Sequence, residues 1–440
     1  MKNLNFRIPF LILVPLIFTI CSLFFEIFGQ GTVVNSTFYS KSLKMNRNLQ
    51  IYLPKGYDQQ STIKYPVIYF LHGAGANHTY YTEVPLVLND LIGTKKILPV
   101  IVVKPDGSTG PWGGSCYTNS ELYGDFEDYI VFDLIKFIDS AYNTNTSRKA
   151  RAIMGHSTGA FGAMKLALKY PDVYCSVVAN SGPLDFKHFS DWIPMILAEN
   201  GGPPVRLYNP YCTTTMYWTY IFYTYAGAFS PNLNNLPYKV DFPIDSVGNW
   251  IDSVWNKWLL HDPAHLVKNI TPNSDLTIFF DCGTSDEYKL YRFNTAFRDT
   301  LDKLGLSYEF QSFSGSHMNQ LGSRFTIAFQ FLDSVMNKSG ATWVANYHNK
   351  NIPQKYILYQ NYPNPFNPST TLSFVIGHSS FVALKVYDVI GKEVATLVNE
   401  EKPAGSYEVT WSAANLPSGV YFYQLKAGNF TSTKKLLLLK

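Results

Sequence analysis

The sequence predicts an α/β fold for the larger, N-terminal part of the chain and a small all-β sandwich for the remainder. Between residues 32 and 340, short apolar runs alternate with segments of helical periodicity, which is typical of a mostly parallel sheet covered by helices on both faces. Near residue 340 this alternating pattern ends, and only short β-type runs separated by Gly and Pro turns follow. The length agrees, because 440 residues suggest two or three domains rather than one.

The composition is that of a globular chain with a surplus of aromatic residues. Hydrophobic residues make up 46% and aromatic residues 16%, whereas only 15% are charged, well below the usual share of roughly a quarter. The formal net charge is +4 and no basic run is present, so we expect no nucleic-acid partner. Five cysteines exclude a disulfide-rich miniprotein, and without a Cys-x-x-Cys pair no structural zinc site is expected.

Residues 1–30 have the features of an export signal. Lys2 and Arg7 form a positive start, an uncharged stretch follows from 8 to 25, and residues 29–31 offer small or polar positions for cleavage. The stretch is longer than a usual signal core, so the alternative is an uncleaved membrane anchor. Three residues argue against an anchor and favour cleavage: Pro9, Pro15 and Glu26.

Export leads to an oxidising compartment, so the pairing of the remaining cysteines matters. The four are Cys116, Cys175, Cys212 and Cys282. They permit two disulfides in three pairings, or buried thiols. For Cys175 and Cys282, which lie in or beside apolar runs, we expect buried thiols.

The predicted sheet is read from apolar runs in chain order. Residues 65–71 are continuously apolar, as expected of a central strand buried on both faces. The predicted strands are 65–71, 98–103, 150–154, 174–179, 275–281 and 308–313. Helical spacing of apolar residues predicts helices over 125–141, 159–170, 290–304 and 325–336.

One motif gives this fold a chemical function. Residues 155–159 read Gly-His-Ser-Thr-Gly, which fits G-x-S-x-G, and they stand between a predicted strand and a predicted helix. That is the context of a nucleophile elbow, in which a tight turn exposes the hydroxyl of Ser157. The alternative is an ordinary glycine turn with a surface serine. The strand-turn-helix setting favours Ser157 as a catalytic nucleophile.

A serine nucleophile needs a base and an orienting acid, which in this arrangement follow on loops after later strands. His317 comes after the predicted strand 308–313 and is the expected base; the alternative is a histidine that caps the following helix. Asp286 lies in the loop after strand 275–281 and is the expected acid. Asp281, at the end of that strand, and Glu287 remain the other candidates.

The developing oxyanion needs two backbone N–H donors. One is expected from Thr158, directly after the nucleophile. The other is expected in residues 72–75, after the first central strand, where Ala74 is our choice. His72 precedes the turn, and we expect it to have a structural role.

Residues 38–335 resemble the esterase D group of α/β-hydrolases, which includes feruloyl and acetylxylan esterases, S-formylglutathione hydrolase, enterochelin-esterase-like proteins and mycobacterial mycolyltransferases. The resemblance implies an α/β-hydrolase fold and carries nucleophile, base and acid over onto Ser157, His317 and Asp286. The stretches that carry it are 51–57, 65–73, 105–107, 126–130, 155–159 and 162–163.

Three features depart from the family pattern. Thr158 and Ala160 replace the Met and the last Gly of the usual elbow, and Asn319 stands where a Trp is common. The third is an aromatic-rich insertion over about 183–263, between nucleophile and acid, where lids of this fold are commonly inserted. Its rings are able to stack on sugars or on a phenolic acyl group. The alternative is that most of them form the core of the insertion itself.

The tail, 353–440, contains four β-type runs that predict a small sandwich: 371–376, 381–387, 407–411 and 419–425. It also carries distinctive motifs at 360–368, 386–388, 391–394, 416–423 and 434–436. By these motifs the tail resembles the C-terminal sorting domain of the Bacteroidetes type IX secretion system. The resemblance implies an address that the outer-membrane secretion machinery reads. The alternative is a sugar-binding or immunoglobulin-like module.

Together these features predict a signal (1–30), an esterase domain (31–340), a linker (341–352) and a sorting domain (353–440). We expect a secreted serine esterase, exported through the periplasm, that needs no metal or organic cofactor. The expected substrates are acetyl or feruloyl esters on polysaccharide. S-formylglutathione is not expected as a substrate, because it is cytosolic and the protein is expected to be exported. The alternatives are an acyltransferase to a sugar hydroxyl with the same triad, and a non-catalytic glycan-binding protein.

Overall fold

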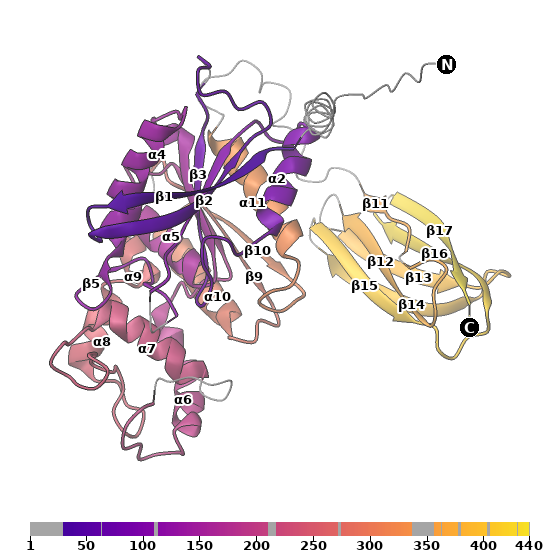
Figure 1. Cartoon of the computed structure of the whole chain (residues 1–440). Coiled ribbons are helices and arrows are strands. Elements are labelled where there is room, and N and C mark those ends of the chain that lie inside the picture. The colour runs from indigo at the N-terminus through magenta and orange to yellow at the C-terminus, as the bar shows by residue number, and fades with distance from the viewer. Residues whose placement is uncertain are drawn as a thin grey trace, which may run out of the picture. The chain divides into compact units, whose positions relative to one another are not determined.

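The computed structural model describes residues 30–439 apart from short gaps. The gaps are 63, 110–112, 210–216, 272–273, 337–355, 362, 377–379, 403–404 and 429. The predicted export signal, except for its last residue, and the predicted linker 341–352 therefore lie outside the described residues. The chain divides into two compact units, Met1–Gly340 and Ala341–Lys440 (Figure 1).

The first unit is built on an eight-stranded sheet with the order β1-β2-β4-β3-β7-β8-β9-β10 (Figure 1). Neighbours from β4 to β10 run parallel, whereas β1 with β2 and β2 with β4 are antiparallel. The predicted mostly parallel sheet is thus confirmed. The strands are β1 (Thr32–Ser40), β2 (Met45–Leu53), β3 (Val67–Leu71), β4 (Ile101–Pro105), β7 (Arg151–His156), β8 (Ser176–Asn180), β9 (Thr277–Gly283) and β10 (Glu309–Phe313).

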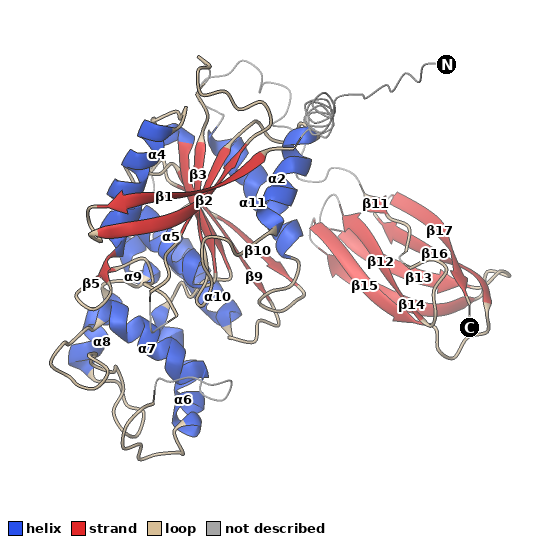
Figure 2. Cartoon of the chain, viewed as in Figure 1, coloured by secondary structure: helices blue, strands red, loops and turns tan. Residues whose placement is uncertain are grey.

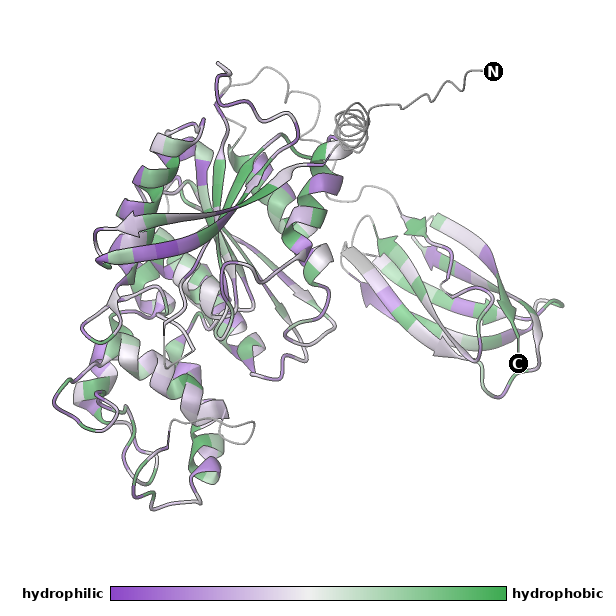
Figure 3. Cartoon of the chain, in the orientation of Figure 1, coloured by the Kyte–Doolittle hydropathy of each residue, from purple (hydrophilic) through white to green (hydrophobic). Residues whose placement is uncertain are grey.

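Helices cover both faces of this sheet (Figure 2). Because side chains of a strand alternate between faces, Ile68 and Phe70 of β3 pack with α2 (Glu83–Gly93) and α11 (Leu321–Met336). The opposite face of the sheet packs with α4 (Ile135–Ala141), α5 (Thr158–Lys169) and α10 (Leu290–Leu304). Burial on both faces explains why the central strands are continuous apolar runs, visible as green strands in Figure 3.

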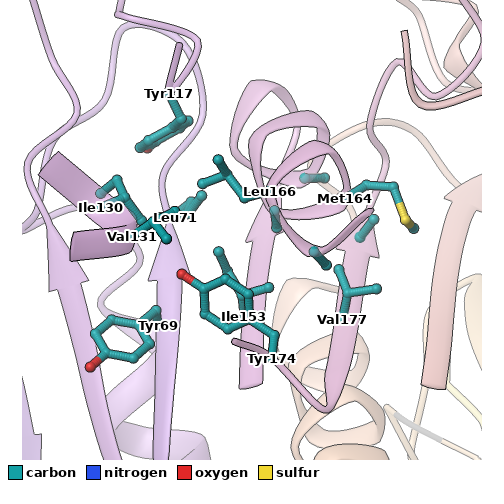
Figure 4. Packing of buried hydrophobic residues seen from close by; sticks show 14 of the residues in the cluster. Tyr69, Leu71, Tyr117, Ile130, Val131, Ile153, Met164, Leu166, Tyr174 and Val177 are labelled. Atoms are coloured by element: carbon teal, nitrogen blue, oxygen red, sulfur yellow. The ribbon is translucent and has the colours of Figure 1, made fainter. Parts of the chain in front are cut away.

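Figure 4 shows part of the core between the sheet and α5. Tyr69, Ile153 and Val177, from three neighbouring strands, belong to one buried cluster with Met164 and Leu166 of α5. Nearly every residue of α5 is buried. The helix that follows the serine motif is therefore held rigidly against the sheet.

The helix predicted over 125–141 is present but not uniform. It consists of α3 (Phe126–Asp128), a π-helical stretch (Tyr129–Leu134) and α4 (Ile135–Ala141). Its predicted apolar face is buried at Phe126, Ile130, Leu134 and Ile138. The π-helical turn shifts the following residues around the axis, which a period of 3.6 residues does not predict.

The aromatic insertion contains three helices joined by long loops, α6 (Ile193–Glu199), α7 (Tyr217–Phe229) and α8 (Asp252–Leu259), and the chain returns to the sheet through the short α9 (Pro263–Leu266) (Figure 1). A two-stranded ribbon, β5 (Asn119–Ser120) and β6 (Gly124–Asp125), contacts α7. Within the described ranges, no helix combines the length and apolar character needed to cross a bilayer.

The second unit consists of two antiparallel sheets, as expected of the predicted sandwich. One has the order β11-β12-β15 and the other β14-β13-β16-β17. All four predicted runs are strands, and three further strands were not predicted. The strands are β11 (Ile357–Leu358), β12 (Ser369–Ile376), β13 (Ser380–Tyr387), β14 (Glu393–Lys402), β15 (Gly405–Ser412), β16 (Gly419–Ala427) and β17 (Phe430–Leu438).

Candidate active site

Ser157 occupies a sharp turn between β7 and α5. Its backbone has φ 59° and ψ −125°, a conformation that is strained for a residue with a side chain. The two motif glycines make the turn possible. A Cβ on Gly155 would lie 2.3 Å from the carbonyl oxygen of Gly159, and one on Gly159 would lie 2.1 Å from that of Leu71. Ser157 is thus held in the geometry of a nucleophile elbow.

Asp286 and His317 are in direct contact. Nδ1 of His317 lies 2.8 Å from Oδ2 of Asp286, and both side chains are buried. The other oxygen of Asp286 accepts from the backbone N–H of Tyr288 at 3.0 Å. Because an ionised carboxylate only accepts, Nδ1 of His317 donates and Nε2 is left to take up a proton.

His317, the expected base, is close to the elbow. Its ring lies 4.7 Å, between centroids, from the ring of His156, the residue before Ser157. No hydrogen bond joins Ser157 to His317 among the residues described. Such bonds are commonly long before substrate binds.

The two other candidate acids have different partners. Asp281 forms a buried ion pair with Arg324 at 2.6 Å and accepts from the side-chain amide of Asn180 at 2.8 Å. Glu287 accepts from the backbone N–H of His317 at 2.9 Å. Neither carboxylate contacts the imidazole of His317, so the geometry favours Asp286 as the orienting acid.

The turn that carries His317 is fixed from several sides. The guanidinium of Arg324 donates to the carbonyl oxygen of His317 at 3.1 Å. Asn319, which departs from the family pattern, accepts from the backbone N–H of Ser316 at 2.8 Å and from its hydroxyl at 2.9 Å. Asn319 therefore closes the turn on which the histidine sits.

The expected oxyanion donors lie beside the nucleophile. Ala74, Ser157 and Thr158 line the same pocket. Thr158 is the first residue of α5, where the backbone N–H has no intrahelical acceptor and the helix dipole favours negative charge.

Residues 72–75, which are expected to supply an oxyanion donor and are named the oxyanion loop, form hydrogen bonds on both sides. Nε2 of His72, for which we expect a structural role, accepts from the backbone N–H of Gly107 at 2.8 Å. The backbone N–H of Gly75 donates to the carbonyl oxygen of Gly113 at 2.7 Å. Gly113 in turn donates to the hydroxyl of Thr224 on α7 at 3.1 Å. This chain of contacts links the oxyanion loop to the insertion.

Three aromatic residues of the insertion, Trp192, Tyr217 and Tyr225, line the pocket. Tyr217, Ile221 and Tyr225 are four residues apart along α7 and face the pocket together. The ring of Tyr217 stacks on Tyr288 at 5.3 Å between centroids. The remaining lining residues are Pro183, Trp192, Tyr288 and Leu290. The sequence did not predict that Trp192, Tyr288 and Leu290 would line the pocket. The only signal for Tyr288 was its position directly after the candidate acids.

Most other rings of the insertion pack against one another. Phe189, Phe222 and Trp258 are buried in a hydrophobic cluster that also includes Trp192 and Tyr225 of the pocket wall. The greater part of the aromatic residues therefore builds the core of the insertion, and Trp192, Tyr217 and Tyr225 line the pocket.

Three of the cysteines are free buried thiols, Cys116, Cys175 and Cys282, while Cys212 lies outside the described residues. Burial raises the pKa of the Cys175 thiol to about 11 and that of Cys116 further still. The thiols expected at Cys175 and Cys282 are thus present, and both are poor nucleophiles at neutral pH.

The fold and the elbow geometry define the first unit as an α/β-hydrolase. The chain belongs to the esterase family, whose family model matches residues 40–321. Residues 360–439 match a secretion system C-terminal sorting domain. The match indicates export by type IX secretion, so the protein is secreted or held at the cell surface.

The chain is similar to several curated proteins and solved structures, among them the following three. Esterase Rv1288 of Mycobacterium tuberculosis is 26% identical over 288 residues, 64% of this chain and 54% of the relative. The endo-1,4-beta-xylanase/feruloyl esterase of Xylanibacter ruminicola is 32% identical over 155 residues, 33% of this chain and 21% of the relative. The chain thus spans about half or less of these relatives. A ferulic acid esterase structure shares the fold, with TM-score 0.50, 20% identity, and coverage of 70% of this chain and 99% of that chain.

Proposed function

We propose that this esterase is a serine hydrolase that cleaves carboxylic esters through an acyl-enzyme. The observation that carries the proposal is the arrangement of the strained Ser157 elbow beside the 2.8 Å contact between His317 and Asp286. A strained turn that exposes one hydroxyl, next to a buried carboxylate–imidazole pair, has the parts that nucleophilic catalysis needs. The reaction requires no metal or organic cofactor.

The first half of the reaction forms the acyl-enzyme. Oγ of Ser157 attacks the ester carbonyl while its proton passes to Nε2 of His317. The negative charge on the carbonyl oxygen is stabilised by the backbone N–H groups of Ala74 and Thr158. The C–O bond to the alcohol then breaks, and His317 gives its proton to the departing oxygen.

The second half releases the acid. His317 takes a proton from water, whose oxygen attacks the acyl carbon, and the bond to Oγ of Ser157 breaks as the proton returns to the serine. Asp286 stays ionised throughout and stabilises the imidazolium that forms in each half. If a sugar hydroxyl takes the place of water, the same residues carry out acyl transfer.

For the substrate we propose esters of aromatic or short acyl groups on polysaccharide, feruloyl and acetyl esters in particular. The wall that Tyr217, Tyr225 and Trp192 form beside Ser157 suits a flat acyl group. The sorting domain directs the protein to extracellular substrates. The name of the Xylanibacter relative points to the same class. We also propose that the chain crosses the periplasm on its way out.

A substrate panel tests this function. Purified full-length protein and the Ser157→Ala variant are incubated with methyl ferulate, acetylated xylan, p-nitrophenyl acetate and a long-chain ester, and the acid released is measured by chromatography. The proposal expects turnover by the wild type only. Adding a sugar acceptor separates the two outcomes of deacylation, because acyl transfer yields a new sugar ester in place of free acid. Folded wild-type protein that turns over none of these esters would refute the proposal.

A further inference from the structure

His156, the second residue of the serine motif, connects two parts of the site. Its ring is fully buried and lies between Tyr81 and His317. Nδ1 of His156 is 2.9 Å from the hydroxyl oxygen of Tyr81, and Nε2 is 3.1 Å from the main-chain carbonyl oxygen of His317. The His156 ring is therefore bound at both of its nitrogens.

The two contacts determine the tautomer of His156. A carbonyl oxygen only accepts, so Nε2 carries the proton and donates to His317. Burial, together with the nearby His317 and Arg324, lowers the pKa of His156 well below its usual range, so the ring is neutral. Nδ1 is then an acceptor, and the hydroxyl of Tyr81 donates to it.

Tyr81 reaches the oxyanion loop from the other side. A Cβ on Gly73 would lie 3.1 Å from the hydroxyl oxygen of Tyr81 and also 3.1 Å from Cβ of Ser157. Tyr81 itself is buried and has φ 57°, a backbone conformation that is costly for a residue with a side chain and that often marks functional sites. Tyr81 therefore packs against the oxyanion loop, which contains Ala74.

The carbonyl of His317 receives a second donor. Arg324 donates to it at 3.1 Å while bound to Asp281. Because the N–H of His317 donates to Glu287 as well, the main chain of His317 is restrained at both its N–H and its carbonyl. Restraint of the main chain restrains where the imidazole stands, and misplacement of a base by about 1 Å costs up to about a hundredfold in rate.

We propose that Tyr81 and His156 are positioning residues that couple the oxyanion loop to the peptide carbonyl of His317, so that the base and the oxyanion donors keep one mutual geometry. The pair does not touch substrate and takes no part in proton transfer. The inference rests on the proposed esterase function and deepens it, because it names residues that act through His317 and the oxyanion loop.

The first test compares two variants of His156 in the full-length protein. His156→Phe replaces the imidazole by a phenyl ring and so removes both hydrogen bonds. His156→Gln keeps an N–H able to reach the carbonyl of His317. With p-nitrophenyl acetate we expect His156→Phe to lower kcat by about tenfold to a hundredfold at nearly unchanged KM. His156→Gln should restore most of the loss. Fluorophosphonate titration gives the number of active molecules, so kcat is expressed per folded molecule. If His156 had a purely structural role, its variants would have a lower melting temperature but an unchanged kcat per folded molecule.

A second variant keeps the proposal testable if His156→Phe does not fold. Tyr81→Phe removes one hydroxyl and should lower kcat by about threefold to tenfold, the effect of one lost neutral hydrogen bond. Tyr80→Phe is the matched control, since Tyr80 is half exposed and lies next in sequence. Wild-type kcat in Tyr81→Phe, and also in His156→Phe where that variant folds, would overturn the proposal. Wild-type protein inactive on every ester would instead refute the esterase function.

Discussion

Nδ1 of His317 and Oδ2 of Asp286 lie 2.8 Å apart, although 31 residues separate them along the chain. The two residues follow β10 and β9, which are parallel neighbours paired as far as Phe313 and Gly283. Because the carboxyl ends of parallel strands lie at one edge of the sheet, the loops after them meet there. The order of the strands thus explains why two residues that are far apart in sequence are in contact. The roles proposed for these residues can be tested by substitution.

Ser157→Ala should lower kcat on p-nitrophenyl acetate by about 10⁴- to 10⁶-fold, because the remaining site has no nucleophile. The change removes one hydroxyl, so we expect the melting temperature to stay close to that of the wild type. Turnover and thermal unfolding are measured on the same preparation. A variant that keeps wild-type turnover would remove the nucleophile assignment from Ser157.

His317→Ala should be about as damaging as Ser157→Ala, because nucleophile and base act as one unit and their losses do not add. The double variant should therefore be no slower than either single variant. The measurement is kcat for all three proteins. A loss far smaller than that of Ser157→Ala would point to a different base.

Asp286→Asn and Asp281→Asn should fail in different ways. Asp286 contacts the imidazole, so Asp286→Asn should lower kcat by about 10⁴-fold at little cost in stability. Asp281 pairs with buried Arg324 instead, so Asp281→Asn should lower the free energy of unfolding by about 3–5 kcal/mol, as loss of one partner of a buried pair does. Activity per folded molecule and denaturant unfolding distinguish the two. The reverse ranking in kcat would move the acid role to Asp281.

The sequence predicts the centre of the fold better than its edges. Strands such as β3 and β8 are buried on both faces and hence continuously apolar. Edge strands β1 and β17 alternate exposed and buried residues and carry Asn, Ser, Thr and Lys, so their apolar signal is weak. Helix α2 contains Pro85, which suggests a break, yet the proline lies in the first turn, where no N–H is needed.

The candidate site, too, was predicted only in part. The order of Ser157, Asp286 and His317 is readable because each follows a predicted strand. The hydrogen bond from the backbone of His317 to Glu287 depends on how two loops meet, and the sequence offers Glu287 only as a candidate acid. Trp192 reaches the pocket through the packing of the insertion, which no local pattern encodes.

Asp262 should make the stability of the protein depend on pH. It lies buried at the end of the insertion and accepts from the backbone N–H of Phe186 at its start. Burial, reinforced by nearby Asp185 and opposed by Lys268, raises the pKa of Asp262 to about 7, against about 3.9 in an unfolded chain. Between about pH 4 and 7 the native state therefore binds more protons, and the free energy of unfolding falls as the pH rises.

Asp262→Asn should remove this dependence, because the amide oxygen still accepts from Phe186 and no charge is buried. We expect the melting temperature of the wild type to fall from pH 5 to pH 8 relative to that of the variant, with each pKa unit worth about 1.4 kcal/mol. Asp172→Asn, at an exposed position, is the control for loss of one carboxylate. Parallel pH profiles for the wild type and Asp262→Asn would contradict the prediction.

A chain that ends at Gly340 should fold and keep its esterase activity but lose its export. All pocket residues and α11, which ends at Met336, precede that point, and the chain divides into compact units there. We expect kcat/KM within about twofold of the full-length value, since each unit has its own core. In a host with type IX machinery the truncated chain should accumulate in the periplasm, where cell fractionation and activity assays locate it. Unchanged export would make residues 353–440 an accessory module, and inactivity of folded truncated protein would mean that the β-domain supports the active site.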